Sequence, residues 1–452
     1  MTDRPMLAII LAAGQGTRMK SRLPKVLHPV AGRAMVGHVL DAARAAGADQ
    51  VAVVIGVGGD RVRESIAADD PDVQVFEQAD QLGTAHAVDA AREAFADFDG
   101  DVLVLYGDTP LIRPATLRAL RESLNDGASL AVLGFEADDP AGYGRLLRDD
   151  EGALIGIREE KDAAADERAI RECNSGVMAF RAEVLGEVLP RIGNDNAKGE
   201  YYLTDAVALA RGRDHTLAVA MGDETEVLGV NDRAQLAGAE AQMQARLRAA
   251  AMAGGATLID PPSVTLSHDT VLGEDVVVEP HVIFGPGVSV GAGARINGFS
   301  HIERASIGAD AQVGPFARLR PGAELGENVR IGNFVEVKKA LLEEGAKVNH
   351  LTYIGDARVG AGANVGAGTI TCNYDGYDKH FTDIGAGAFI GSNTALVAPV
   401  KIGDRAYIGS GSVITRDVAE GALALSRAPQ EERDGWADRM TARRKRRDKD
   451  QD

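Results

Sequence analysis

The amino-terminal stretch "LAAGQGTRMKSRLPK", residues 11–25, holds the residues best suited to bind phosphate. Gly14 and Gly16 would let backbone N–H groups approach phosphate oxygens closely, and Arg18 and Lys25 would supply positive charge. The stretch is not a Walker A loop, because no Gly-Lys-Ser/Thr follows, and it is not a Rossmann fingerprint. We therefore predict a phosphate-binding loop of another kind, with a tight strand-to-helix turn as the alternative.

Two oxygen-bearing side chains are candidates to hold a divalent cation beside such a loop. Asp108 follows the apolar run "LVLYG", and Asn231 lies in "GVND". Mg²⁺ prefers hard oxygen ligands, and it is usually held by one or two side chains together with substrate phosphates. The alternative for Asp108 is a turn-capping role before Thr109, and the alternative for Asn231 is capping of the helix that follows.

A histidine in the carboxyl-terminal half, His350, is the candidate general base. The imidazole of histidine has an unperturbed pKa near 6.5, so it can accept the proton of an amine that attacks an acyl group at neutral pH. Tyr353 follows three residues later. His281 and His301 lie in the same region, so a histidine alone does not mark the site and its polar neighbours must carry the argument.

The elements that would position the amino-terminal residues are strands alternating with helices. Up to about residue 230, apolar runs such as "QVAVVIG" and "DVLVLYGD" alternate with amphipathic patterns such as "AMVGHVLDAARAAG", "HAVDAAREAFADF" and "ATLRALRESLND". This alternation predicts an α/β, Rossmann-like domain with a mostly parallel sheet. Such sheets bind ligands at the carboxyl ends of their strands, where both the opening loop and Asp108 would lie.

An alanine-rich segment separates this half from the rest of the chain. Residues 232–253 contain no proline and a single glycine, which predicts one helix that ends at Gly254 and Gly255. We therefore predict three parts: a first domain over residues 1–231, a joining helix over 232–254, and a second domain over 255–452.

Apolar residues recur every six positions through the second domain. A strict period of six fits neither a helix nor an ordinary strand; it predicts a parallel β-helix with three short faces in each coil of about 18 residues, and roughly nine coils. The segment 371–383 interrupts the repeat, and insertions in solenoids tend to carry function. The residues predicted to face inward are Leu272, Val278, Phe284, Val290, Ile296, Ile302, Ile307, Val313, Leu319, Leu325, Ile331, Val337, Leu342, Val348, Ile354, Ile384, Ile390, Leu396, Ile402, Ile408 and Ile414.

The composition restricts the class of partner and the compartment. The chain has 452 residues and a formal net charge of −18, which argues against non-specific nucleic-acid binding because phosphates would be repelled. The basic stretch "RMTARRKRRDKD" is expected to be a solvated tail. With two cysteines, Cys173 and Cys372, and neither a signal-peptide pattern nor a membrane-spanning apolar run, we expect a reduced, cytoplasmic compartment.

Several motifs together resemble those of sugar-1-phosphate nucleotidyltransferases. The opening stretch has the form L-x-x-G-x-G-x-R with a later Pro-Lys, and "QLGTAHA", "YGD", "GYGR", "EEKDA", "NSG" and "GVND" follow in order. With the hexapeptide region behind them, nearly the whole chain is similar to the bacterial family of bifunctional N-acetylglucosamine-1-phosphate uridyltransferases/glucosamine-1-phosphate N-acetyltransferases. The resemblance implies a nucleotidyltransferase domain followed by a left-handed parallel β-helix with acetyltransferase activity.

The same resemblance implies two consecutive reactions. The second domain would transfer an acetyl group from acetyl-CoA to glucosamine-1-phosphate. The first domain would then couple N-acetylglucosamine-1-phosphate to UMP from UTP and release pyrophosphate, which would feed the synthesis of peptidoglycan and lipopolysaccharide precursors. The resemblance also implies Mg²⁺ as cofactor, small-molecule substrates without nucleic acid or membrane partners, and a homotrimer.

Matched position by position, the resemblance assigns a role to individual residues. Catalysis would fall to His350, Arg18 and Lys25, with Glu336 as a candidate to orient the base, and Asp108 and Asn231 would hold the metal. The UTP and UDP-sugar pocket would be formed by Leu11, Ala12, Ala13, Gly14, Lys25, Gln78, Gly83, Thr84, Tyr106, Gly107, Asp108, Gly144, Glu159, Asn174 and Asn231. Glucosamine phosphate would be bound by Arg320, Lys338, Tyr353 and Asn364. Acetyl-CoA would be bound by Ala367, Asn373, Tyr374, Ser392, Ser410 and Arg427. Ser410 stands where the family often has alanine.

Two other interpretations stay open at the level of sequence. The chain could be a nucleotidyltransferase with a single activity, for ADP-glucose or GDP-mannose for example, whose β-helix only regulates or oligomerises. It could also be a non-catalytic scaffold that keeps the fold. The intact opening motif and "GDT" favour catalysis over a scaffold, and His350 with "TCNYDGY" favours acetyl transfer over a regulatory module.

Overall fold

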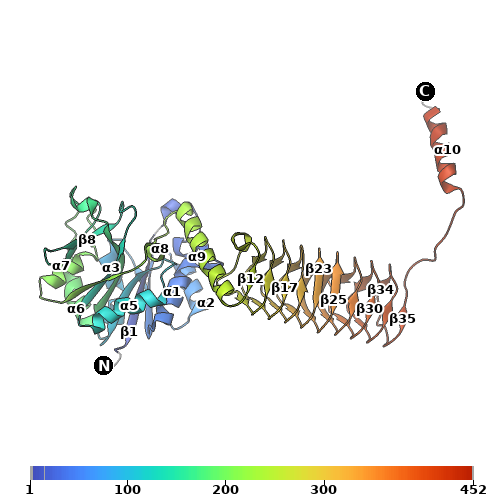
Figure 1. The fold of residues 1–452 in the computed structure, drawn as a ribbon, viewed down its shortest axis with the longest axis horizontal. Coiled ribbons are helices and arrows are strands. Elements are labelled where there is room, and N and C mark those ends of the chain that lie inside the picture. Colours follow the sequence, from blue (N-terminus) through green and yellow to red (C-terminus); the bar gives the residue numbers. More distant parts are fainter. Residues whose placement is uncertain (1–3, 15, 450–452) are drawn as a thin grey trace. The chain divides into compact units, whose positions relative to one another are not determined.

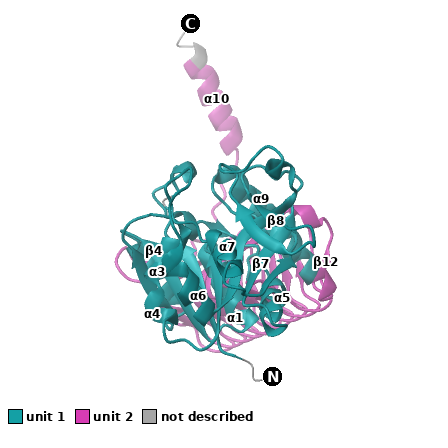
Figure 2. Ribbon diagram, turned by 90° about the vertical axis from the view of Figure 1, so that its left-hand side faces the viewer, with its two compact units in different colours: residues 1–250, 266–268 teal, residues 251–265, 269–452 magenta. Residues whose placement is uncertain are grey.

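The chain folds into two compact units, which Figure 2 colours separately. The structure is a computed structural model that describes residues 4–14 and 16–449. The first unit comprises residues 1–250 and 266–268, and the second comprises residues 251–265 and 269–452.

The first unit is built on a nine-stranded sheet whose main path runs β11-β7-β10-β6-β1-β4-β5. Neighbouring pairs are parallel except where β10 lies antiparallel between β6 and β7, and the hairpin of β8 and β9 is attached to β10. The strands are β1 (Met6–Ala12), β4 (Gln50–Gly56), β5 (Gln74–Gln78), β6 (Asp101–Tyr106), β7 (Leu130–Glu136), β8 (Gly144–Arg148), β9 (Leu154–Arg158), β10 (Glu172–Arg181) and β11 (Leu217–Met221). The prediction of an α/β domain with a mostly parallel sheet is confirmed.

Helices cover both faces of this sheet, which explains why its central strands are apolar throughout. In β1, Ala8 and Ile10 pack into one core cluster, whereas Leu7 and Ile9 pack into the other. The helices are α1 (Met35–Ala46), α2 (Asp60–Asp69), α3 (Thr84–Ala90), α4 (Arg92–Phe95), α5 (Pro114–Asn125), α6 (Ala182–Val188), α7 (Asp205–Arg211) and α8 (Glu224–Val227). The segment expected as one helix over 86–98 is divided at Ala91. Backbone hydrogen bonds there join residues three apart instead of four, so the helix is locally wound more tightly.

The long helix α9 (Arg233–Ala253) occupies the segment in which a joining helix was predicted. Asp232 caps it, because its Oδ1 atom accepts hydrogen bonds from the backbone N–H groups of Ala234 and Gln235, both at 2.9 Å. Only Ala239 and Gln244 are fully buried along its length. The division between the two units falls near the carboxyl end of α9, after residue 250.

The second unit is a parallel β-helix of short strands stacked coil upon coil (Figure 1). One face is a ten-stranded sheet, and the other two faces are joined where the longer strands β24 and β26 continue around a corner. The ten-stranded sheet contains β12 (Thr257–Leu258), β14 (Val277–Val278), β17 (Arg295–Ile296), β20 (Gln312–Val313), β23 (Arg330–Asn333), β25 (Lys347–His350), β27 (Asn364–Val365), β30 (Phe389–Ile390), β33 (Tyr407–Ile408) and β35 (Leu423–Ala424). The other faces contain β13 (Val271–Leu272), β15 (Ile283–Phe284), β16 (Val288–Val290), β18 (His301–Ile302), β19 (Ala305–Ile307), β21 (Arg318–Leu319), β22 (Ala323–Leu325), β24 (Glu336–Leu342), β26 (Tyr353–Val359), β28 (Ile370–Cys372), β29 (Thr382–Ile384), β31 (Ala395–Val397), β32 (Val400–Ile402) and β34 (Val413–Ile414).

The residues with a period of six form the interior of this β-helix. All of them are buried except Leu272 in β13, which is half-buried. The same position recurs on every face, so each coil contributes three apolar side chains to one continuous core. The inward direction that was predicted from the six-residue period is therefore confirmed.

Two segments depart from the repeat. Residues 373–381 form a loop between β28 and β29, within the predicted insertion. At the carboxyl end, residues 436–449 form helix α10, and its described side chains, up to residue 447, are exposed. Residue 450 of the basic stretch lies outside the described residues. Within residues 4–14 and 16–449, no helix combines the length and hydropathy that crossing a bilayer requires.

Shortening one inward isoleucine tests the β-helix core. Ile390 is fully buried, so Ile390→Ala should lower the free energy of unfolding by about 2–5 kcal/mol through lost burial and a new cavity. Chemical denaturation of the full chain would measure this loss. In the control Ile283→Ala, the side chain faces outward and is 43% exposed, so the loss should be well under half as large. Equal losses in the two variants would contradict the inward assignment.

Two candidate active sites

The first site forms at the edge of the first unit's sheet where parallel strands end together. Leu11, at the end of β1, is in register with Val54 of β4 and with Tyr106 of β6. The backbone N–H of Gly107 donates to the carbonyl oxygen of Leu11 at 2.9 Å. The opening loop and the "YGD" turn are therefore neighbours, as expected for a ligand site at a carboxyl edge.

A cavity of about 310 Å³ opens at this edge. Its walls include most of the residues predicted to bind the nucleotide: Leu11, Ala12, Ala13, Gly14, Lys25, Gln78, Gly83, Thr84, Tyr106 and Asp108. Val26, Gln81, Ala87 and Glu200 also line it, and sequence reasoning did not single them out. The site residues from three separate motifs thus surround one space.

Lys25 connects two of these motifs at the cavity. Its Nζ atom forms an ion pair with Asp108 Oδ2 and donates a hydrogen bond to Asn231 Oδ1 at 3.2 Å. Other residues fill the capping roles that were considered for Asp108 and Asn231. The Thr109 hydroxyl bonds the carbonyl oxygen of Tyr106 at 2.8 Å, and Asp232 caps α9. Asp108 therefore lines the cavity, and Asn231, which does not line it, is joined to it through Lys25.

The chemistry of this pair fits the predicted metal site. A carboxylate oxygen and a carboxamide oxygen converge on one cation, which is now the ammonium of Lys25. Two such hard oxygens are the protein ligands that Mg²⁺ uses when phosphates complete its coordination. A closed cage of protein ligands is not needed for this, and no cluster of three or more His, Cys, Asp or Glu suited to a metal occurs among the described residues.

The residues predicted to contact the sugar lie together at the β8–β9 hairpin and β10, but they are not among the residues that line the cavity. Gly144 in β8 is in register with Asn174 in β10, and a Cβ atom at Gly144 would lie 3.6 Å from Oε1 of Glu159. Glu159 accepts a hydrogen bond from the Thr204 hydroxyl at 3.2 Å, and burial raises its pKa. The pKa of Tyr106 is raised by burial first and by the negative charge of Glu159 second.

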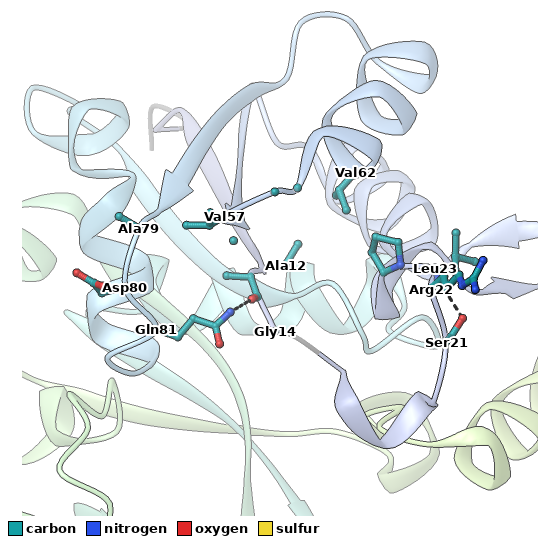
Figure 3. Close-up of a pocket in the computed structure, with 15 residues that line it drawn as sticks. Ala12, Gly14, Ser21, Arg22, Leu23, Val57, Val62, Ala79, Asp80 and Gln81 are labelled. Carbon is teal, nitrogen blue, oxygen red and sulfur yellow. Dashed lines mark hydrogen bonds between the residues drawn. The ribbon is translucent and has the colours of Figure 1, made fainter.

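Gln81 is a site residue that the sequence analysis did not name, although it lies in "QLGTAHA". Its Nε2 atom donates to the carbonyl oxygen of Ala13 at 2.5 Å, which joins the loop that contains "QLGTAHA" to the opening loop (Figure 3). It also lines a second cavity of about 600 Å³ beside the first, which Arg22 and the loop 56–59 complete. Its place in this motif was the signal in the sequence that could have identified it as a site residue.

Arg18 does not enter either of these two cavities. It lies in the short helical turn Thr17–Met19 and is exposed. The turn is fixed by Gly16, which has a φ of +60°, and a Cβ atom there would lie 2.6 Å from the Cβ atom of Lys25. Glycine is thus required at Gly16 because the backbone is left-handed and packs closely against Lys25. The structure brings Lys25, but not Arg18, to the predicted phosphate region.

The second site lies on the β-helix and is built from successive coils. Glu336 and Tyr353 occupy equivalent positions in β24 and β26, as do Lys338 and Gly355. Arg320 follows β21 in the preceding coil and binds Glu336 through Nη1 at 2.7 Å. Arg320, Lys338 and Tyr353, three of the predicted sugar-phosphate residues, therefore share one face of adjacent coils.

His350 stands at the corner next to this face. It ends β25, and Tyr353 begins β26 only three residues later. Its Nδ1 atom lies 2.9 Å from Oδ1 of Asn333, which occupies the equivalent position in the preceding coil. The role of Glu336 in orienting this histidine stays a prediction: Glu336 is in register with Tyr353 and pairs with Arg320, and the side chain that contacts Nδ1 of His350 is that of Asn333.

The inserted loop begins beside these residues. Asn373 is buried, and its Nδ2 atom donates to Asp356 Oδ2 at 2.5 Å and to the Tyr353 hydroxyl at 3.4 Å. Tyr374 is exposed, with the Lys379 ammonium 3.9 Å from its ring centre. The insertion thus brings Asn373, a predicted acetyl-CoA residue, to Tyr353, whereas the contacts of Tyr374 lie within the loop.

The remaining residues predicted to bind acetyl-CoA form a column. Val365, Ile390 and Ile408 are in register across three coils. Ala367, Ser392 and Ser410 each follow two residues later, and Nη1 of Arg427 donates to the carbonyl oxygen of Ser410 at 2.6 Å. Asn364 begins the strand that leads to Ala367. The column therefore starts in the coil next to His350 and continues toward the carboxyl end.

Comparison with known proteins identifies both halves. A family model described as a MobA-like NTP transferase domain matches residues 8–172, and one described as bacterial transferase hexapeptide (six repeats) matches residues 304–339 and 381–416. The hexapeptide match agrees with the predicted left-handed parallel β-helix.

Relatives described as bifunctional protein GlmU match almost the full chain. The protein of Xanthobacter autotrophicus is 59% identical over 98% of this chain and 99% of its own length. The protein of Azorhizobium caulinodans is 60% identical over 98% and 99%, and that of Rhodospirillum rubrum is 60% identical over 97% and 98%.

The inserted loop offers a test of its own rigidity. Asp375 accepts backbone hydrogen bonds from Tyr377 and Asp378 and one from His380 Nε2, and the backbone bonds in particular hold its pKa well below the usual range. Asp375→Ala should therefore open the loop and speed its cleavage in limited proteolysis at pH 7.

The matched control is Asp378→Ala, whose side chain takes part in none of these bonds. Because the pKa of Asp375 is lowered by folding, its stabilisation is present above the pKa of the unfolded chain and is lost as the pH falls through the lowered value. Protection of the loop in the unaltered protein should then be equal at pH 7 and pH 5. A marked loss at pH 5, or equal cleavage of the two variants, would contradict this role.

Proposed function

Because the chain belongs to the family of the bifunctional protein GlmU, we propose how its residues divide two reactions between its two units. The chain is a bifunctional transferase of UDP-N-acetylglucosamine synthesis, with a nucleotidyltransferase domain and a hexapeptide acetyltransferase domain. The family excludes the alternatives of a scaffold or of a nucleotidyltransferase with a merely regulatory β-helix.

In the first unit, uridylyl transfer would take place at the cavity of about 310 Å³. An oxygen of the sugar phosphate attacks the α-phosphorus of UTP, the bond to the β-phosphate breaks, and pyrophosphate leaves. No covalent enzyme intermediate is needed, so the protein acts by alignment and by neutralising charge. The observation that carries this proposal is that Lys25 and Asp108 line the cavity and that Lys25 binds both Asp108 and Asn231.

Asp108 and Asn231 would hold Mg²⁺, which when bound neutralises phosphate charge. Lys25 would then turn from these two oxygens toward the phosphates, because all three groups meet at one point. Leu11 to Gly14 would contact the phosphates through the backbone, and Gln78, Gly83 and Thr84 would bind the base. Tyr106 and Gly107 would complete the wall, and Arg18 would assist only after a rearrangement of its exposed turn.

Gly144, Glu159 and Asn174 would bind the acetylated sugar. Glu159 is half-buried and is held by Thr204 at 3.2 Å, so it offers a fixed acceptor to a sugar hydroxyl. An unfilled hydrogen bond at a partly buried carboxyl is costly. The site would therefore discriminate against sugars that lack the matching hydroxyl.

In the second unit, His350 would act as the base of acetyl transfer. Its Nε2 atom takes a proton from the amine of glucosamine-1-phosphate, the amine nitrogen bonds to the thioester carbon of acetyl-CoA, and the coenzyme A thiolate leaves and is protonated. Arg320 and Lys338 would bind the phosphate, and Tyr353 and Asn364 would bind the sugar. Arg320 is paired with Glu336 at 2.7 Å, so the phosphate would compete for it.

Acetyl-CoA would lie along the column of Ala367, Ser392 and Ser410. Asn373 and Tyr374 would flank the acetyl group, and Arg427 would meet the phosphates of the coenzyme. Arg427 reaches the backbone oxygen of Ser410. The replacement of the family's alanine by Ser410 is then of little consequence, because the contact uses the main chain.

We also propose that the β-helix forms a homotrimer. A second set of residues in register on the ten-stranded sheet begins at Asn364 and continues through Phe389, Tyr407 and Leu423; we call these last three residues the apolar column. Phe389 and Tyr407 stack with ring centres 4.5 Å apart, and Tyr407 and Leu423 are 50% and 64% exposed. A second copy packed on this face would cover these apolar groups and enclose the open acetyl-transfer site. We place the enzyme in the cytoplasm, where UTP and acetyl-CoA are available.

A charge on the apolar column tests the assembly. Tyr407→Asp should shift the protein toward monomers in light scattering and lower acetyl transfer at least tenfold, because burying a carboxylate against apolar groups is unfavourable. Lys401→Asp changes the charge on another face of the same coil and should leave the assembly unchanged. Unaltered assembly of the Tyr407→Asp variant would exclude this face as the interface.

Separate loss of the two activities tests the site assignment. His350→Ala should lower acetyl transfer by about 10²–10⁴-fold and leave uridylyl transfer near normal. Asp108→Asn should lower uridylyl transfer, raise the Mg²⁺ concentration needed, and leave acetyl transfer near normal. Each variant is the folding control for the other when both reactions are assayed on the same preparation. Full acetyl transfer by His350→Ala would overturn the assignment of the base.

A further inference from the structure

We propose that Asn333 is the positioning residue that orients His350 and fixes which imidazole nitrogen acts as the base. The inference rests on the proposed role of His350 in acetyl transfer. It starts from one contact, the 2.9 Å approach of Asn333 Oδ1 to His350 Nδ1. Neither composition nor the resemblance to known enzymes pointed to Asn333.

The backbone fixes both partners of this contact. Asn333 ends β23 and His350 ends β25, and the two residues are in parallel register. The preceding Gly332 packs so closely on the next coil that a Cβ atom would lie 1.9 Å from the carbonyl oxygen of Asn349. The carbonyl oxygen of His350 accepts bonds from the Thr352 hydroxyl at 2.6 Å and the Gly368 N–H at 3.1 Å. Neither Asn333 nor His350 can therefore move independently of the coil to which it belongs.

The contact determines the tautomer of the imidazole. A carboxamide oxygen can only accept a hydrogen bond, so Nδ1 of His350 must carry the proton. Nε2 is then unprotonated in the neutral ring and offers its lone pair to the amine of the substrate. Asn333 would thus place the proton acceptor on one defined nitrogen before the substrate binds.

The two carboxylates on the strands of these coils, those of Glu336 and Asp356, are held by other groups. The charged or titratable side chains on β25 and on the strands of the same coils are Arg330, Glu336, Lys338, Lys339, Lys347, Tyr353, Asp356, Arg358 and Cys372. Glu336 is bound by Arg320 at 2.7 Å, and Asp356 accepts from Asn373 at 2.5 Å. The orienting group of His350 is therefore a neutral amide.

Two variants of Asn333 test the proposal in the full-length enzyme. Asn333→Ala removes the acceptor, and kcat of acetyl transfer should fall about tenfold, with KM for glucosamine-1-phosphate and acetyl-CoA within twofold of the unaltered values. Asn333→Asp keeps an acceptor but adds a negative charge that favours the protonated imidazole. The acidic limb of its pH–rate profile should move to higher pH by about one unit, while kcat on the plateau recovers.

The matched control is Asn328→Asp, an exposed asparagine in the same coil with the same change of charge. Its pH profile should not move. A residue with a merely structural role would lower stability without shifting the acidic limb, and a sugar-binding residue would raise KM. Either result, or an unshifted profile in Asn333→Asp, would overturn the proposal. His350→Ala, assayed in parallel, reports separately on whether His350 is the base at all.

Discussion

Parallel register between strands is the constraint on which both candidate sites depend. In the first unit it aligns the ends of β1, β4 and β6, so that loops distant in sequence meet at one edge. In the second unit it places residues about one coil apart directly above one another, as with Asn333 and His350. A shift of one residue in either register would turn inward side chains outward and separate the groups that must act together.

The ion pair of Lys25 and Asp108 shows how the first unit uses this alignment. Lys25 comes from the opening loop, Asp108 from the end of β6 and Asn231 from the residues before α9. One ammonium thus holds three segments together, with only 11% of its side chain and 18% of that of Asp108 exposed. If phosphates and a divalent cation bind as we propose, the same charged groups would exchange partners and none of them would be left unpaired. Without these ligands, the ion pair of Lys25 and Asp108 compensates both charges.

The sequence predicted the parts of this molecule that follow from pattern, and it missed those that follow from three-dimensional contact. The period of six correctly marked the β-helix interior, because an inward position recurs on every face. The alternation of strands and helices correctly marked the first unit. It could not reveal that β10 runs antiparallel between β6 and β7, since an apolar strand looks the same in either direction. Of the first candidate site, Lys25, Asp108 and eight other residues that line the cavity were predicted from their motifs. Gln81 and Asn333 were not, because their partners, Ala13 and His350, are set by packing rather than by spacing along the chain.

The pairing of Glu336 with Arg320 gives a physical reason for a neutral partner at His350. The proposed site must keep Arg320 and Lys338 available for a phosphate while a nearby imidazole accepts a proton. Glu336 already competes for Arg320 at 2.7 Å. A second carboxylate at the corner would attract the same cations and favour the protonated, inactive imidazole. In the proposed site, an amide at Asn333 would orient the ring through one hydrogen bond and add no charge, so the cations would stay available to the substrate and the base would stay unprotonated for the amine.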